Sequence, residues 1–303
     1  KLQNLTTTIR NYFKEKNIKI SNIKIENQKI FFNVVDDDKQ SVLDVFNDEN
    51  SDLNPYYPRF KSHQLEIEDT GLNLKVNFSR QGLIKLKTSS QDQAIEIVRR
   101  RVDEIGTNEP NILKRGSDRI VVELPGLDNP DRIKSLLGKT ANLTFRFITQ
   151  SEEESFGTER IPFQDEEGDA IVSKRIILSG DNLVDAQPRM DNQANETVVS
   201  FTLDRVGAKK FAKATTSGVG KNLAIILDGK IISAPSVREP IVGGSGQITG
   251  GFTFQTATDL ALLLRSGALP APMKIIEERT VGPDLGQDSI DAGILSLIIG
   301  FAL

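Results

Sequence analysis

The sequence contains no cysteine and only one histidine, which removes the usual ligands of transition metals. Without cysteine, neither a disulfide framework nor a thiolate metal site can form. His63 lies in a polar stretch, so a catalytic triad or a histidine metal site would depend on that residue alone. A solvated surface histidine is the simpler interpretation. We therefore predict no catalytic residue, no metal site and no enzymatic activity.

An excess of positive charge is also missing. Lys and Arg number 38 against 42 Asp and Glu, which gives a net charge of −4 and an isoelectric point near 5.4. Nucleic-acid-binding domains need a basic face, so this balance argues against a nucleic-acid partner.

Nucleotide-binding motifs are incomplete. The segment 215–222 lacks both the leading glycine of a phosphate loop and the Ser or Thr that should follow Lys221. No predicted helix opens behind the glycines of 243–251, so they do not fit a dinucleotide fingerprint. The acidic runs 36–38 and 152–154 lack the spacing of a calcium loop. We expect no nucleotide and no other cofactor.

The strongest local signal is the stretch Lys221–Pro235, in which Asp228-Gly229 separates two apolar runs. Asp-Gly suits a type I′ hairpin turn, because that turn needs φ > 0 at both central residues. The run Leu223–Leu227 is apolar without alternation, which predicts a strand covered on both faces.

Two successive groups of predicted elements share the order helix, hairpin, helix, strand. A leading strand would turn this order into the βαββαβ pattern of a ferredoxin-like unit, and in the first group it would precede Lys1. The fold class is therefore predicted as α+β. The first group comprises 2–16, 18–25, 29–35, 39–46 and 65–78; the second comprises 91–105, 111–113, 120–124, 128–137 and 142–148.

The helix 91–105 shows clear amphipathic periodicity. Ala94, Ile95, Val98, Val102 and Ile105 should face inward, and the run Arg99–Arg101 should face largely outward. Gly106 is placed to end the helix.

The remainder of the chain changes character several times. Gln150–Ala170 is rich in Glu, Asp, Ser and Gly, which predicts a mobile linker. Strands then dominate 171–250, interrupted by one helix near 204–214. A helix should begin at Thr256, with Asp259 completing a capping box. Met273–Thr280 is predicted as a closing strand.

The last residues, Ala292–Leu303, are uninterruptedly apolar. A membrane-spanning helix takes about 20 apolar residues, so we interpret this run as the beginning of one. An ordinary buried helix at the C-terminus is the alternative.

Four stretches together resemble one family, the SecD subunits that assist bacterial protein export. They are Ala94–Pro110, Arg119–Gly126, Leu223–Pro235 and Gly251–Gly286, the last with Arg-Ser-Gly-Ala-Leu-Pro-Ala-Pro at 265–272. Residues 1–87 match the family only in general style, as a variable insertion.

The resemblance implies a domain organisation. It suggests a ferredoxin-like base at 88–149 and 252–283, with an α+β head inserted at 150–251. Residues 1–87 would be a preceding insertion with a ferredoxin-like pattern, and 284–303 would be the membrane boundary and the start of the transmembrane helix.

The resemblance also implies a function. Such a subunit sits in the bacterial inner membrane with this region in the periplasm, and acts with SecF beside the SecYEG channel without a nucleotide of its own. Base and head change orientation while holding the emerging preprotein, in a cycle driven by the proton gradient. The helices that carry proton transfer lie outside this sequence.

An unfolded passenger chain could be held by a sheet edge or a shallow apolar groove. Candidate preprotein-binding residues follow the central hairpin; plain core packing is their alternative role. They are Ile231, Ile232, Ser233, Val237, Ile241 and Val242. Gln150 and Ser151 on one crossing, and Gly250 and Gly251 on the other, are candidate hinges.

Two other functions remain open. A porter domain of a related proton-driven pump for a small molecule or lipid would show the same pattern, and a large apolar pocket between lobes would favour it. A periplasmic hydrolase would need a convergent set of titratable groups, and the sequence shows none.

Overall fold

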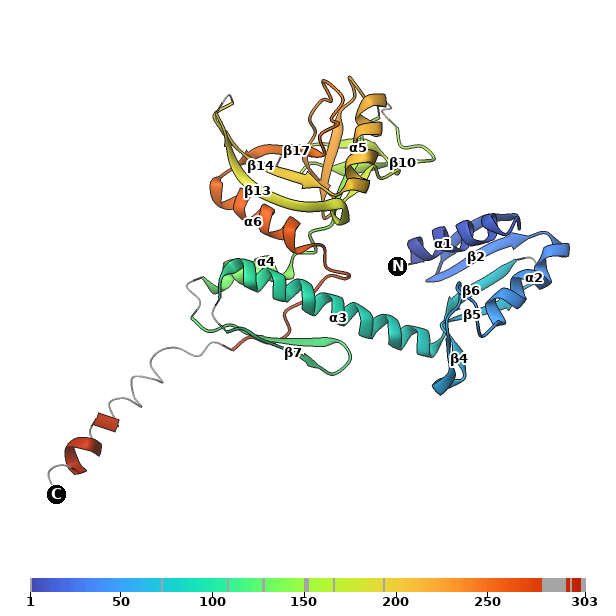
Figure 1. The fold of residues 1–303 in the computed structure, drawn as a ribbon, viewed down its shortest axis with the longest axis horizontal. Coiled ribbons are helices and arrows are strands. Elements are labelled where there is room, and N and C mark those ends of the chain that lie inside the picture. Colours follow the sequence, from blue (N-terminus) through green and yellow to red (C-terminus); the bar gives the residue numbers. More distant parts are fainter. Residues whose placement is uncertain are drawn as a thin grey trace. The chain divides into compact units, whose positions relative to one another are not determined.

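The computed structural model describes residues 2–71, 73–107, 109–126, 129–149, 153–165, 167–192, 194–279, 293–294 and 296–300. The chain divides into two compact units, Lys1–Asp128 and Asn129–Leu303, and each is described by itself (Figure 1). Both mix helices with several small antiparallel sheets, so the α+β class is confirmed.

The first unit begins with a four-stranded antiparallel sheet in the order β1-β2-β6-β5. Phe13 of α1, Phe32 of β2 and Phe46 of α2 lie in one core, so both helices pack against the sheet. A short hairpin of β3 and β4 follows α2. The elements are α1 (Leu2–Glu15), β1 (Ile20–Glu26), β2 (Lys29–Val34), α2 (Asp36–Asn47), β3 (Tyr56–Tyr57), β4 (Ser62–His63), β5 (Leu65–Asp69) and β6 (Leu74–Phe78).

Several predictions for this sheet are confirmed and two are wrong. The predicted hairpin of 18–25 and 29–35 forms, and Asn27 and Gln28 in its turn have φ of 48° and 62°. The single strand expected over 65–78 is instead a hairpin, because the turn around Gly71 reverses the chain. The strand beside β2 is β6, not a strand before Lys1. The observed order is therefore αββαββ, with the small β3–β4 hairpin before its last two strands.

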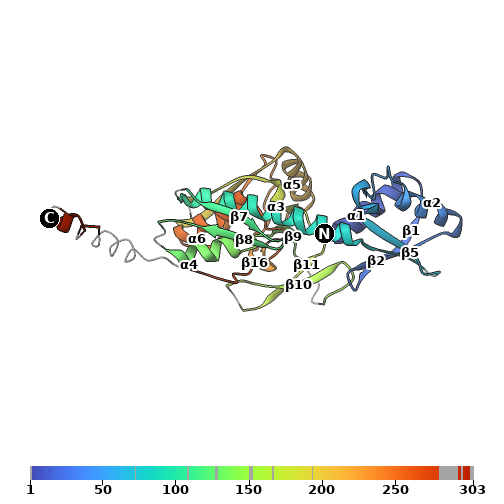
Figure 2. The same ribbon diagram turned by 90° about the horizontal axis from the view of Figure 1, so that it is seen from below.

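The rest of the first unit is a long helix followed by a hairpin (Figure 2). The helix α3 (Arg80–Ile105) begins well before the predicted Gln91, because the Ser79 hydroxyl accepts from the N–H of Gly82 and caps it. It ends as predicted at Gly106, whose φ is 82°. The strands β7 (Asn111–Arg115) and β8 (Arg119–Glu123) form a two-stranded sheet.

The inward face of α3 was predicted correctly, with one exception. Ala94, Ile95, Val98 and Val102 are buried. Arg101, predicted to point outward, has an exposed fraction of 0%. Its position lies three residues after Val98, on the same side of the helix, so the periodicity places it inside.

The second unit contains two larger sheets and one small sheet. Their orders are β12-β9-β15-β16, β13-β14-β17 and β10-β11. The elements are α4 (Pro130–Gly138), β9 (Leu143–Phe147), β10 (Thr158–Pro162), β11 (Asp169–Ser173), β12 (Leu178–Ser179), β13 (Leu183–Asp191), β14 (Glu196–Leu203), α5 (Arg205–Ser217), β15 (Leu223–Leu227), β16 (Lys230–Ser233), β17 (Ser245–Phe252) and α6 (Phe254–Ser266).

The central hairpin forms as predicted. Asp228 and Gly229 have φ of 49° and 81° between the paired strands β15 and β16. Leu223 and Ile225 face the main core, which includes Phe145. Ala224 and Ile226 face a smaller core on the other side of β15. The strand is therefore covered on both faces, as its sequence indicated.

Other predictions for the second unit are wrong. The expected linker 150–170 contains β10, because Thr158–Pro162 pairs residue by residue with β11. The helix α6 is capped by Thr253, whose hydroxyl accepts from the N–H of Thr256, so the helix starts at Phe254. Residues 273–279 form no strand.

Two broader predictions concern the boundary between base and head and the membrane-spanning helix. The base and head boundary stays a prediction, although β9 and α6 of the expected base share a core with Phe201 of the expected head. The described part of the chain holds no helix that is both apolar enough and long enough to cross a membrane. Most of the predicted membrane run 292–303 is described as exposed helix, at 293–294 and 296–300.

Candidate functional site

An apolar pocket of about 260 Å³ lies in the second unit. Three phenylalanines from different elements form part of its lining: Phe145 of β9, Phe201 of β14 and Phe211 of α5. Their ring centroids lie 5.5–6.3 Å apart at tilted or edge-on angles, the geometry that aromatic rings prefer. All three are buried, so they also belong to the core of the unit.

One glycine provides space for these rings. Gly246 of β17 lines the pocket, and a Cβ built on it would lie 2.6 Å from Cζ of Phe201. Any other residue would therefore displace the ring. The pocket and the packing of Phe201 depend on this close approach.

The segment 235–241 lines the pocket and is held at both ends. At one end the strand ladder continues, since the N–H of Leu223 donates to Pro235 O at 2.9 Å and the N–H of Val237 donates to Lys221 O at 2.9 Å. At the other end the N–H of Ile241 donates to Oγ1 of Thr215 at 3.0 Å. The Thr215 hydroxyl in turn donates to Phe211 O, so this buried hydroxyl both accepts and donates a hydrogen bond.

The exposed middle of this segment forms a rim of the pocket that carries charges of both signs. Arg238 and Glu239 line it and are exposed, so one charge of each sign stands beside an apolar interior. Such a site suits a large apolar side chain whose neighbours stay in water. Among the described residues no group of three His, Cys, Asp or Glu side chains could hold a metal ion.

The predicted preprotein-binding residues separate into three groups. Val237 and Ile241 line the pocket. Ile231 and Ile232 have exposed fractions of 1% and 8% and belong to the two cores on either side of the hairpin. The remaining two residues lie elsewhere: Ser233 is half-buried with its hydroxyl 3.3 Å from that of Thr249, and Val242 is 75% exposed.

The sheet edge at β16 is already partly occupied. Phe163 bridges Ile231 in parallel register, and the N–H of Gln164 donates to Ile231 O at 2.9 Å. A passenger strand would have to displace this contact. The pocket lined by 235–241 is the other predicted binding mode, and Ser236, Arg238 and Glu239 on its rim are exposed.

The predicted hinge glycines have clear local roles. Gly250 faces the carbonyl oxygen of Ile232, which a Cβ would approach to 2.9 Å, and Gly251 has a φ of 62°. Both lie where the register of β14 and β17 shifts between Thr197 and Val199. Gln150 and Ser151 lie outside the described residues. Hinge motion stays a prediction for all four.

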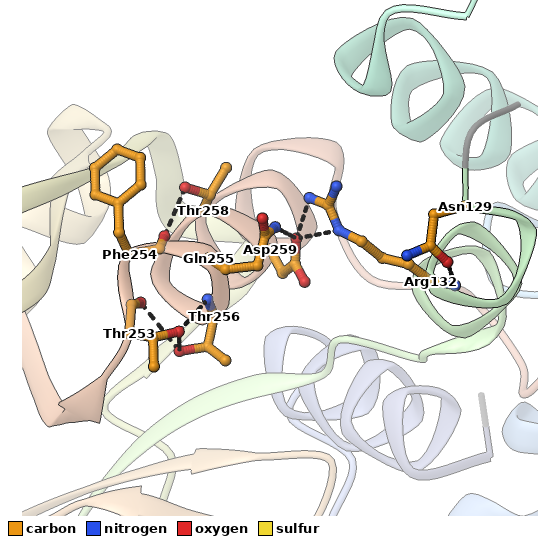
Figure 3. A network of polar contacts seen from close by, with 8 residues as sticks. All are labelled: Asn129, Arg132, Thr253, Phe254, Gln255, Thr256, Thr258 and Asp259. Atoms are coloured by element: carbon orange, nitrogen blue, oxygen red, sulfur yellow. Dashed lines mark hydrogen bonds and ion pairs between the residues drawn. The ribbon is translucent and has the colours of Figure 1, made fainter.

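A polar network joins α4 to α6 at the end of the main core (Figure 3). Nε and Nη2 of Arg132 donate to Oδ1 of Asp259 at 3.2 and 2.6 Å, and Nε2 of Gln255 donates to the same oxygen at 3.0 Å. Asn129 caps α4 through the N–H of Arg132. This network fixes the helix α4 against α6.

Lys134 of α4 also forms ion pairs with two carboxylates. Lys134 contacts Asp131 and Glu278, and these carboxylates raise the pKa of Lys134. Glu278 therefore holds the segment after α6 against α4.

Sequence reasoning missed the aromatic lining and Thr215. The strand with Phe201 and the helix with Phe211 were both predicted, but nothing in their spacing shows that the rings meet. The contact joins residues on three elements that are distant in sequence, and only the packing of the two larger sheets with α5 brings them together.

Comparison with known proteins identifies the family. Residues 91–150 match the N-terminal part of the P1 domain of protein translocase subunit SecDF, and residues 158–271 match the SecDF P1 head subdomain. A solved structure of SecDF, described as a membrane component that enhances protein export, is 32% identical over 94% of its own chain and 64% of this one, with a TM-score of 0.55. The chain belongs to the SecD family.

Other SecD relatives agree. Protein translocase subunit SecD of Acetobacter pasteurianus is 50% identical over 70% of this chain and 42% of its own length. SecD of Rickettsia bellii is 39% identical over 99% of this chain and 58% of its own length. SecDF in its super-membrane-facing form is 35% identical over 71% of this chain, with a TM-score of 0.56.

The chain thus spans about half the length of the curated SecD relatives, 42% and 58% in these two cases. The Rickettsia match covers 99% of this chain and therefore extends into 1–87, the segment predicted from the sequence to be a variable insertion. The relatives are named as subunits of a protein translocase.

Proposed function

We propose that this chain is the periplasmic region of a SecD subunit, and that it holds an emerging preprotein through the apolar pocket of its second unit. The observation that carries this proposal is the pocket itself, which three aromatic rings line and the segment 235–241 borders. An unfolded polypeptide offers apolar side chains at intervals along an exposed backbone. An apolar side chain that enters the pocket would be held by apolar contacts, whatever the sequence of the preprotein around it.

The size of the pocket supports a polypeptide over the small-molecule pump. Sites for drug-sized ligands usually enclose about 300–1,000 Å³. At about 260 Å³ the pocket is smaller than that range and lies within one unit. It fits a single large side chain better than a whole lipid or drug.

The family suggests a wider mechanism, which we include in this proposal. SecF and the SecYEG channel would be the partners, in the bacterial inner membrane, and no nucleotide would be needed by this subunit. The proton gradient would change the orientation of base and head, and Gly250 with Gly251 would form one crossing of that hinge. Release of the side chain from the pocket would then accompany the change.

The test is photo-crosslinking in the intact membrane protein while a preprotein is stalled in the channel. A photoreactive residue at Ser236, an exposed position on the pocket lining, should crosslink to the stalled chain only when the proton gradient is present. Val184 of β13 is the control, because it is 64% exposed and does not line the pocket.

The substitution Ser236→Tyr should reduce both crosslinking and export, since its ring can fill the opening. Ser89→Tyr on the exposed side of α3 should change neither. Equal crosslinking at Val184 would show that the pocket is not the holder. Labelling by an apolar small-molecule probe, with no crosslink to the stalled chain, would favour the pump.

A further inference from the structure

The helix α5 carries a continuous basic face that takes no part in the pocket. It consists of Arg205, Lys209, Lys210 and Lys213, together with Lys221 just beyond the helix. At about 100° per residue, the four helical cations fall within an arc of about 140°. The opposite side of the helix carries Phe211 and Thr215, which are buried against the core.

These cations are not neutralised within the described part of the chain. None of the five forms an ion pair with a described residue, and Nζ of Lys221 lies 5.7 Å from the centroid of the Phe147 ring. Asp204, the residue directly before the helix, caps its N-terminus by accepting from the N–H of Gly207. A chain with a net charge of −4 has thus concentrated unpaired positive charge on one helix.

Apolar side chains are exposed beside the charges. Val206 lies within the same arc of α5 and is 58% exposed, and Val219 follows the helix at 49%. Lysines beside exposed apolar side chains, with no acid among them on the helix, suit contact with anionic lipid headgroups.

We propose that the basic face of α5 binds the headgroups of anionic phospholipids. The face lies on a helix and not on a strand edge, and its cations do not line the pocket, whereas a lipid surface needs only charge and shallow apolar contact. Lysine side chains can extend toward phosphates while their methylene groups stay with Val206. The proposal gives the second unit a membrane contact separate from its pocket.

A single fluorescent label tests this directly, because the chain has no cysteine of its own. Thr216→Cys lies on the exposed arc of α5 and would carry an environment-sensitive dye. Its emission should shift to the blue on phosphatidylcholine vesicles that contain phosphatidylglycerol, but not on pure phosphatidylcholine. The same dye at Ser89→Cys on α3 should not respond, and raised salt should weaken the response.

Charge variants supply the matched comparison. Lys209→Glu, Lys210→Glu and Lys213→Glu together should lower binding to the anionic vesicles at least about a hundredfold, since each basic residue at a membrane surface contributes roughly fivefold. Lys14→Glu, Lys85→Glu and Lys87→Glu change the net charge equally and should leave binding almost unchanged. A triple change to Gln, a good helix former, covers the case in which the Glu variant misfolds.

Three results would overturn the proposal. Equal losses in the two triple variants would mean that only net charge matters. A matching blue shift at position 89 would mean that the whole chain adsorbs. A response to soluble polyglutamate as strong as that to the vesicles would assign the basic face to an acidic polypeptide.

Discussion

Asp228 shows how one side chain can have a role that its motif does not reveal. Besides forming the hairpin turn, its Oδ1 accepts from the N–H of Asn142 at 2.8 Å and its Oδ2 accepts from the N–H of Ala141 at 3.0 Å. Ala141 has a φ of 58°, an uncommon conformation for a residue with a Cβ. The carboxylate therefore holds the strained entrance of β9 beside the end of β15.

We expect Asp228→Ala to lower the free energy of unfolding by about 1–2 kcal/mol, because both hydrogen bonds to a charged acceptor are lost. Asp228→Asn should cost less, since one acceptor oxygen remains. Urea unfolding followed by circular dichroism measures both. Asp118→Ala, in the turn between β7 and β8, is the control; a loss as large there would show that the turn alone explains the effect.

At the scale of the element, α3 is a single helix with two different environments. Its later half is buried through Ala94, Val98 and Val102, whereas Leu83 and Ile84 in its first half are 45% and 49% exposed. The first turn is nevertheless fixed, because Gly82 packs against the carbonyl of Gln64 and Ser79 donates to His63 O at 2.6 Å. The start of the helix is thereby attached to the junction of β4 and β5.

Gly82→Ala should loosen this attachment, because the added Cβ would overlap the carbonyl oxygen of Gln64. A clash with backbone costs about 1–3 kcal/mol. Hydrogen exchange should become faster in β4, β5 and the start of α3, with the end of α3 unaffected. Gly138→Ala in α4, where nothing lies within 4 Å of the new Cβ, should be neutral or stabilise the chain by about 0.4–1 kcal/mol. Unchanged exchange in Gly82→Ala would refute the role of this contact.

At the scale of the whole molecule, the chain divides into two compact units, each with a hydrophobic core of its own. Phe13 belongs to the core of the four-stranded sheet and Phe145 to the core around the pocket. No hydrophobic cluster among the described residues contains both. The two units should therefore unfold independently.

Calorimetry should then resolve two transitions. Phe13→Ala should lower the free energy of unfolding of the first unit alone. Phe145→Ala should lower that of the second unit alone, and each loss should be about 3–5 kcal/mol. Each variant is the other's control. A single transition that moves with either substitution would show that the units are coupled.

What the sequence determined by itself is mostly local. The turns at Asn27-Gln28 and Asp228-Gly229, the two-sided burial of β15 and the end of α3 at Gly106 all follow from backbone preferences or short-range patterns. The family also follows, since its motifs are contiguous stretches.

Only the tertiary structure decided which elements meet. It pairs β9 with β15 and places β6 beside β2, because each pairing depends on a partner distant in sequence. The pocket has the same origin: the rings of Phe145, Phe201 and Phe211 come together only when β9, β14 and α5 pack. Local preference selects each element, but the space between elements depends on shapes that no single segment contains.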